Sequence, residues 1–229
     1  MRLIEFAGLP GSGKTTIVNR LASDLLSEGA TVYTRYKMMA DDKSALVRHL
    51  LRARYVLRGL MTRPGLFLRA LSLIRQDGQA SLFSLAKVCW NFWCVLGWYL
   101  WLARHAQGGV VLVDQGIIQA IWSVRFAASR KGAHWRAFIT SLPFDIDAVV
   151  VVSCDLVVVQ ERLSGRVGGY SRLEHAGISG DDCSRARAEL EMLVNVIPTC
   201  VVSVDNSVPE CADEVLDSLK QELGLLSCY

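Results

Sequence analysis

The sequence predicts an α/β fold built on a doubly wound, five-stranded parallel sheet. Short apolar runs rich in β-branched residues alternate along the 229 residues with longer segments of helical pattern. Two of these runs, 110–113 and 148–152, are continuously apolar, as central parallel strands buried on both faces should be. Strands that alternate with helices imply right-handed crossovers, which place helices on both faces of the sheet.

The expected elements alternate along the whole chain, 1–229, which suits a single domain. Strands are expected at 2–7, 30–36, 109–114, 147–153 and 200–204. Helices are expected at 13–28, 45–60, 65–76, 81–106, 116–130, 133–141, 155–166, 181–196 and 208–223. The 72 residues 37–108 separate the second and third strands. They exceed an ordinary crossover, so a helical insert is expected there.

Composition and cysteine spacing narrow the class of protein. A chain of this length can bury about 70–75% of the surface that its unfolded form exposes, so it needs no disulfide staple. Its seven cysteines are an odd number without a C-x-x-C pair, and several lie inside apolar runs. That usage is typical of reduced thiols in a cytoplasmic protein, and it argues against a disulfide framework or a zinc site. The chain enters a strand at once, which leaves no room for a signal peptide.

Residues 8–15 read Gly-Leu-Pro-Gly-Ser-Gly-Lys-Thr and match the phosphate-binding pattern G-x-x-x-x-G-K-[ST] between a strand and a helix. Glycines let the backbone point its N–H groups at phosphate oxygens, and the following helix N-terminus favours the same anion. The pattern predicts that Lys14 reaches the β- and γ-phosphates of ATP and that the Thr15 hydroxyl binds Mg²⁺. The expected nucleotide-binding residues are Gly8, Pro10, Gly11, Ser12, Gly13, Lys14, Thr15 and Thr16.

The apolar run 110–113 ends in Asp114, which is the pattern of a Walker-B strand. It places the carboxylate at the carboxyl end of the sheet, where open α/β sheets bind ligands. Asp114 is therefore expected to bind Mg²⁺ with Thr15, and it is also the candidate base for an acceptor hydroxyl. Asp41 and Asp42, downstream of the second strand, are the alternatives for the base.

Residues 164–180 are predicted to form a lid. The helix that begins after Asp155 gives way to a glycine-rich stretch, and Arg162 and Arg166 lie four residues apart, so they would share a helix face. Phosphoryl transfer needs positive charge over the γ-phosphate and exclusion of water, which a closing lid with arginines supplies. Arg162 and Arg166 are therefore candidate catalytic residues, and a solvated surface loop is the alternative.

The first half of the insert, 43–76, is strongly basic. It holds eight of the chain's 25 basic residues and none of its 22 acidic ones, so the rest of the chain carries −5. Arginines alternate there with large apolar side chains, and Thr62-Arg63-Pro64-Gly65 predicts a turn between two helices. The default interpretation is a solvated basic face over a packed apolar face. Peripheral contact with an anionic membrane, or with an anionic acceptor, is the alternative.

The second half, 82–103, is nearly all apolar, holds four tryptophans and is long enough to span a bilayer. However, Lys87 and Asn91 interrupt it, and with Ser84 they mark one polar stripe. The tryptophans are spread along the segment instead of being confined to its ends. A core helix lying against the sheet is therefore expected, with a membrane span or a wall of the acceptor pocket as alternatives.

These motifs resemble those of P-loop nucleotide kinases, in particular thymidylate kinases and their deoxynucleoside-kinase relatives. Residues 31–35 stand where those enzymes carry a strand ending in Arg-Glu-Pro, Asp114 stands at their Asp-Arg, and Arg162 and Arg166 at their lid arginines. Residues 204–207 stand at the loop that packs against adenine. The resemblance skips 37–105, and it implies that Asp205 contacts the nucleotide and that Arg35 positions the acceptor.

One departure bears on the acceptor. The arginine that follows the Walker-B aspartate in thymidylate kinases is Gln115 here, and glutamine is a poorer phosphate clamp because it has no charge. A neutral hydroxyl-bearing acceptor, such as a nucleoside, sugar or antibiotic, fits Gln115 and Gln119 better than a monophosphate. Trp122 and Arg125 on the same expected helix are further candidate contacts, unless they are ordinary helix residues.

The sequence therefore predicts a cytoplasmic, ATP- and Mg²⁺-dependent small-molecule kinase that transfers the γ-phosphoryl group to a hydroxyl or phosphate acceptor. Two alternatives stay open: a membrane-docked kinase of a lipid-linked acceptor, working through 43–76, and an NTP-hydrolysing switch. The switch would require features that are missing here, such as a glutamate next to Asp114. No nucleic-acid partner is expected, and a homodimer is left open.

Overall fold

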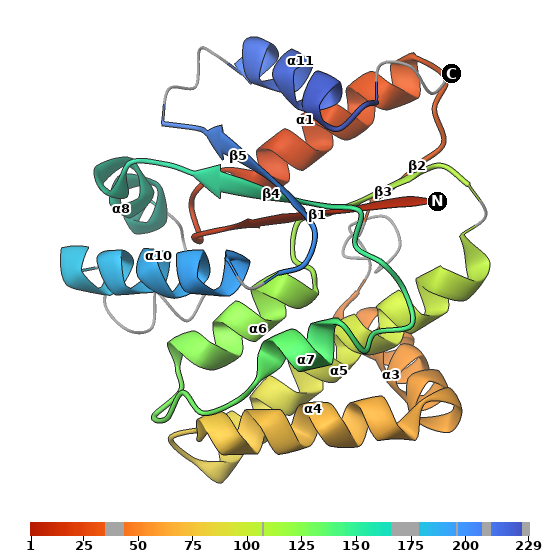
Figure 1. The fold of residues 1–229 in the computed structure, drawn as a ribbon, viewed down its shortest axis with the longest axis vertical. Helices are drawn as coiled ribbons and strands as arrows, with labels where there is room; N and C mark the ends of the chain where they lie inside the picture. Colours follow the sequence, from red (N-terminus) through yellow and green to blue (C-terminus); the bar gives the residue numbers. More distant parts are fainter. Residues whose placement is uncertain (35–43, 107, 166–178, 196, 208–211, 226–229) are drawn as a thin grey trace.

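The fold is a parallel five-stranded sheet between two layers of helices (Figure 1). The computed structural model describes residues 1–34, 44–106, 108–165, 179–195, 197–207 and 212–225. The strand order is β2-β3-β1-β4-β5 and all neighbours are parallel, which confirms the predicted fold class. The strands are β1 (Arg2–Gly8), β2 (Val32–Thr34), β3 (Val110–Val113), β4 (Ala148–Ser153) and β5 (Cys200–Asp205).

The helices follow the expected order. They are α1 (Lys14–Ser27), α3 (Ala45–Thr62), α4 (Pro64–Asp77), α5 (Leu82–His105), α6 (Ile117–Phe126), α7 (Trp135–Ile139), α8 (Leu156–Ser164), α10 (Gly180–Val194) and α11 (Ala212–Glu222). The expected helix at 116–130 was too long. The structure ends α6 at Phe126 because the next backbone groups bond to the end of α4: Ser129 N donates to Gly78 O and Arg130 N to Asp77 O.

Alternate residues of β1 serve two separate apolar cores, as expected for a strand covered on both faces. Ile4 and Phe6 pack in a core with α1 and α11, whereas Leu3 and Ala7 belong to the core formed with α5, α6, α8 and α10. Glu5 lies between Leu3 and Ala7 in this alternation, so its carboxyl group points into the second core. The pairing of Glu5 with Val113 brings the end of β3 beside the middle of β1.

The insert between β2 and β3 consists of α3, α4 and α5, and α5 is its central helix (Figure 1). Trp98 and Tyr99 are fully buried there. The helix packs on α3, α4 and α6, and it reaches β1 through Tyr99. In the described part of the chain, no helix combines the length and the hydropathy that crossing a bilayer requires. The expectation of a core helix is confirmed, although α5 lies chiefly against other helices.

Close packing of α3 against α5 depends on Gly97. A methyl group added there would lie 2.6 Å from the carbonyl oxygen of Tyr55, which belongs to the α3 backbone and cannot move aside like a side chain. Gly97→Ala should therefore destabilise the fold by about 1–3 kcal/mol, although alanine is otherwise the better helix former. The free energy of unfolding in urea measures this effect.

Gly65 in α4 is the matched control, because nothing lies within 4 Å of a Cβ added to it. Gly65→Ala should be neutral or stabilise by up to about 1 kcal/mol. Equal effects of the two substitutions would show that the α3–α5 contact is looser than described.

Candidate active site

The loop between β1 and α1 has the backbone conformation of an anion cradle. Gly11 and Gly13 have φ values of 87° and 90°, a left-handed region that favours glycine. Gly13 is the N-cap of α1, and with no side chain it cannot satisfy the N–H groups of the first helical turn. Those groups and the positive end of the helix dipole face the loop, which is the arrangement that binds phosphate.

Lys14 and Thr15 stand at the start of α1, on the inner side of this loop. The ammonium group of Lys14 is buried and donates to the carbonyl oxygens of Gly8 and Leu9, each at 2.8 Å. The Thr15 hydroxyl donates to Asp114 Oδ2 at 2.7 Å. The first residue after β3 and the second residue of α1, 99 positions apart in sequence, thus meet at the carboxyl edge of the sheet.

The residues present fit a magnesium-bound nucleotide. A hydroxyl and a carboxylate are oxygen ligands of the kind that Mg²⁺ prefers, and Mg²⁺ commonly takes its other ligands from phosphate and water. Among the described residues, no three His, Cys, Asp or Glu side chains lie together as a metal cluster. Protein ligands for Mg²⁺ at this site would therefore be few, namely the hydroxyl and the carboxylate. The Ser12 hydroxyl is buried in the loop with no hydrogen-bond partner in the described chain, as suits a donor to an anion.

Arg162 and Asn206 cover the outer side of the loop. Arg162 donates to the carbonyl oxygens of Gly11 at 3.3 Å and Asn206 at 3.4 Å, while Asn206 Nδ2 donates to Ser12 O at 2.8 Å. Asp205 is exposed and accepts hydrogen bonds from the backbone and hydroxyl of Ser207, so it shapes the turn after β5. Asn206 was missed as a site residue, although it lies in the same segment as Asp205.

The other predicted site residues are more scattered. Thr16 is exposed in the first turn of α1, and Pro10 lies in the loop. Gln115 is exposed directly after Asp114. Gln119 accepts a hydrogen bond from Gly8 N at 3.2 Å, so its amide supports the phosphate-binding loop. Several predicted features lie outside the described residues: Arg35, Arg166, Asp41, Asp42 and 166–178 of the expected lid.

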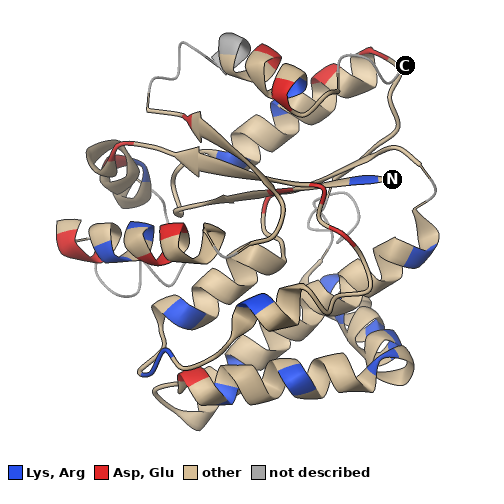
Figure 2. Cartoon of the chain, in the orientation of Figure 1, with Lys and Arg blue, Asp and Glu red and all other residues tan. Residues whose placement is uncertain are grey.

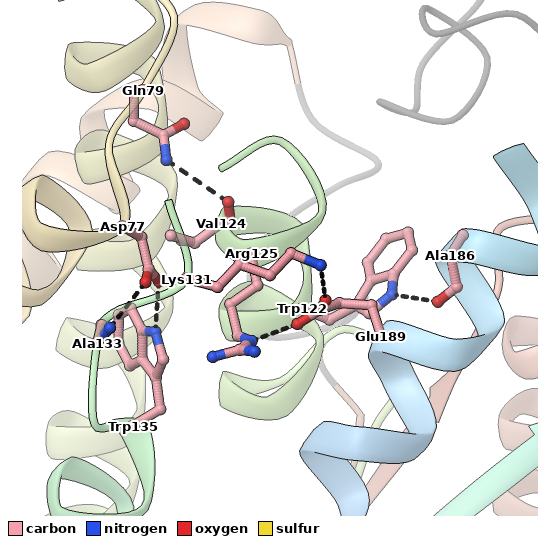
Figure 3. A network of polar contacts seen from close by, with 10 residues as sticks. All are labelled: Asp77, Gln79, Trp122, Val124, Arg125, Lys131, Ala133, Trp135, Ala186 and Glu189. Atoms are coloured by element: carbon pink, nitrogen blue, oxygen red, sulfur yellow. Dashed lines mark hydrogen bonds and ion pairs between the residues drawn. The ribbon is translucent and has the colours of Figure 1, made fainter. Parts of the chain in front are cut away.

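Trp122 and Arg125, predicted either to contact an acceptor or to be ordinary helix residues, both have partners on α10, which supports the second interpretation (Figure 3). Trp122 Nε1 donates to Ala186 O at 2.9 Å, and Arg125 and Lys131 form ion pairs with Glu189. Burial raises the pKa of Glu189, but hydrogen bonds from Lys131 and Arg125 and their charges outweigh it, so the pKa lies below its ordinary value. These contacts hold α6 against α10.

The most deeply buried carboxyl group near the site belongs to Glu5, which the sequence analysis did not single out. Glu5 is 1% exposed and accepts hydrogen bonds from the Tyr99 hydroxyl and from the backbone N–H groups of Ile117 at 2.9 Å and Ile118 at 3.0 Å. It thereby satisfies the N-terminus of α6 from a neighbouring strand. The available signal was a charge in the middle of an apolar strand.

A phosphate-cradling loop on the first strand of a β2-β3-β1-β4-β5 parallel sheet defines a protein with the P-loop kinase fold. No family model and no curated protein sequence matches the chain. Among solved structures it is similar to deoxyadenosine kinase from M. mycoides with the products dCMP and dCDP. That match has a TM-score of 0.57 and 14% identity and covers 99% of this chain and 100% of the other.

A second structure of the same kinase, with dATP bound, matches at a TM-score of 0.52 and 13% identity, over 98% of this chain and 100% of the other. At these identities the similarity establishes the fold. It extends through the helical insert, which the motif resemblance to thymidylate kinases had skipped.

Burial of Glu5 should be visible in the pH dependence of stability. Loss of water raises its pKa above the ordinary 4.5, while the hydrogen bonds from Tyr99, Ile118 and Ile117 act in the opposite direction. Above pH 4.5 the folded chain therefore keeps a proton that the unfolded chain has released, and stability contributed by this group falls as pH rises. The difference in unfolding free energy between wild type and Glu5→Gln should shrink with rising pH.

Urea denaturation at several values between about pH 4.5 and 7.5 measures that difference. Glu161→Gln, which removes an exposed carboxylate on α8, is the matched control. A difference that grows with pH would mean that the hydrogen bonds to Glu5 outweigh its burial.

Proposed function

We propose that this protein is an ATP-dependent phosphotransferase that acts on a small molecule. The observation that carries the proposal is the 2.7 Å contact between Thr15 and Asp114, beside the loop that holds Lys14. It joins the hydroxyl and the carboxylate that P-loop kinases use around Mg²⁺, in a fold to which nucleoside kinases also belong.

In this proposal the residues around the loop bind the phosphates, hold Mg²⁺ and stabilise the group that is transferred. The loop N–H groups and Lys14 bind the β- and γ-phosphates, and Thr15 and Asp114 hold Mg²⁺, whose charge offsets that of the phosphates. The acceptor oxygen forms a bond to the γ-phosphorus while the bond to the β–γ bridging oxygen breaks. Arg162 stands over Gly11 and, with Arg166, stabilises the charge that develops during transfer.

The acceptor proton needs a base. Asp114 is the first candidate, with Asp41 and Asp42 as the alternatives. Thr16, in the first turn of α1, and Asp205, the last residue of β5, are proposed as nucleotide contacts, and Arg35 as an acceptor contact.

A nucleoside is the acceptor that we propose first. The similar structures are those of deoxyadenosine kinase, and the neutral Gln115 follows Asp114 where a monophosphate acceptor would favour arginine. Sugars and hydroxyl-bearing antibiotics share the same chemistry and are the next candidates. We assign Gln119 to support of the loop, because its side-chain oxygen accepts from Gly8 N.

Lys14→Ala tests the nucleotide site. Removing the ammonium group should lower kcat/KM for ADP release from Mg²⁺-ATP by at least about 100-fold, the usual effect of losing a charged group that acts on the transition state. Arg20→Ala, an exposed position on α1, is the control and should leave the rate unchanged. Transfer at the wild-type rate by Lys14→Ala would contradict the proposal.

A panel of acceptors tests the role of Gln115. ADP release should be stimulated by nucleosides more than by nucleoside monophosphates, because the residue after Asp114 is the uncharged Gln115 and not an arginine that would bind the acceptor's phosphate. Gln115→Arg should shift the ratio of the two kcat/KM values towards monophosphates by about ten-fold. Stimulation of the wild type by monophosphates alone would contradict the nucleoside assignment, and ATP hydrolysis that no acceptor increases would favour a switch protein.

A further inference from the structure

We propose that the outer face of helix α3 docks on an anionic lipid bilayer. Four large apolar residues, which we call the α3 stripe, project from this face: Leu46, Leu50, Leu57 and Met61. Their exposed fractions are 70%, 61%, 60% and 84%. Spacings of four, seven and four residues place them in one row along the helix.

The α3 stripe has no part in the core. The opposite side of α3, with Tyr55, Val56 and Gly59, is buried against the rest of the insert. The helix is thus apolar on two sides, although packing against α5 requires only one apolar side. Single exposed leucines are common, but an aligned row on one element marks an interaction surface.

The charge around the α3 stripe identifies the partner. Residues 44–76 contain seven arginines and no aspartate or glutamate, while the rest of the chain is acidic on balance. Arg54 and Arg58 are exposed on α3 among the apolar residues. Figure 2 shows basic residues along α3 and α4, where the only acidic residue is Asp77 at the end of α4, while further acidic residues lie on α10 and α11. Peripheral membrane binding typically combines two contacts: apolar side chains such as leucine and methionine enter the membrane interface, and arginines reach the lipid phosphates.

A second copy of the chain fits this face poorly. A two-fold contact would set each stripe against itself, and the arginines of both copies would then face one another without acidic residues from 44–76 to offset them. An anionic lipid surface meets the apolar and the basic groups together. In Figure 1, α3 lies at the side of the molecule away from α8 and the carboxyl end of β1, so docking leaves the nucleotide site accessible.

Co-sedimentation with vesicles tests the proposal and needs neither nucleotide nor acceptor, so its outcome is independent of the kinase assay. The full chain should bind vesicles of phosphatidylcholine with about one third phosphatidylglycerol at about 0.03 M salt. It should bind much less at about 0.5 M salt, where the Debye length shortens several-fold. Vesicles of phosphatidylcholine alone should bind weakly.

Two variants separate the contributions. The triple variant Leu50→Ser, Leu57→Ser, Met61→Ser should lower the partition coefficient at least about ten-fold. The double variant Arg54→Gln, Arg58→Gln should lower it about five-fold per arginine and reduce the salt dependence. The matched control is Val157→Ser with Met192→Ser, which removes exposed apolar groups from α8 and α10 and should bind like the wild type. Circular dichroism confirms that each variant is folded.

Three results would overturn the proposal. The first is no binding to anionic vesicles at low salt. The second is an equal loss of binding in the control, which would mean that any exposed apolar residue suffices. The third is a concentration-dependent dimer of the free protein that the triple variant dissociates, which would assign the α3 stripe to a second copy.

Discussion

The buried carboxyl group of Glu5 is the contact on which the arrangement of the site depends. A carboxyl group inside an apolar core is tolerated when its oxygens accept hydrogen bonds. The hydrogen bonds that Glu5 accepts are donated by residues of α5 and α6. The strand that leads into the phosphate loop, the insert and the segment after Asp114 are therefore held together. Gly116 is explained by the same contact, because a side chain there would collide with Glu5 and Tyr99.

A second set of contacts ties the two ends of the predicted lid to this framework. On one side, Arg162 of α8 reaches Gly11 of the phosphate loop. On the other, Glu189 of α10 holds Arg125 and Lys131 (Figure 3), and Arg187 donates to Cys154 O at the end of β4. The Glu189 carboxylate is buried, so removing both Arg125 and Lys131 would leave its charge uncompensated. The segment between α8 and α10 thus begins and ends on elements that contact the loop or α6.

Features that depend on local sequence patterns could be predicted from the sequence, whereas features that depend on packing between distant segments could not. The phosphate loop and Asp114 were predictable because each is a local pattern in a strand-and-helix context, and the parallel sheet brings their ends together. The roles of Trp122 and Arg125 were not, because the face of α6 that meets α10 is decided by packing between distant segments. The end of α6 was misplaced for the same reason, since Asp77 and Gly78 accept the N–H groups that would have continued the helix.

Two independent requirements act on the two sides of helix α3 in the insert. On its inner side, the α3 backbone must approach α5 closely, and it can do so because Gly97 of α5 has no side chain to meet the Tyr55 carbonyl group. On its outer side, the leucines of the α3 stripe gain little from folding because most of their surface stays in water. Exposed apolar rows favour aggregation, and like-charged arginines repel one another. Neither feature stabilises the fold, so both are more reasonably attributed to a surface outside the protein that is apolar and anionic at once.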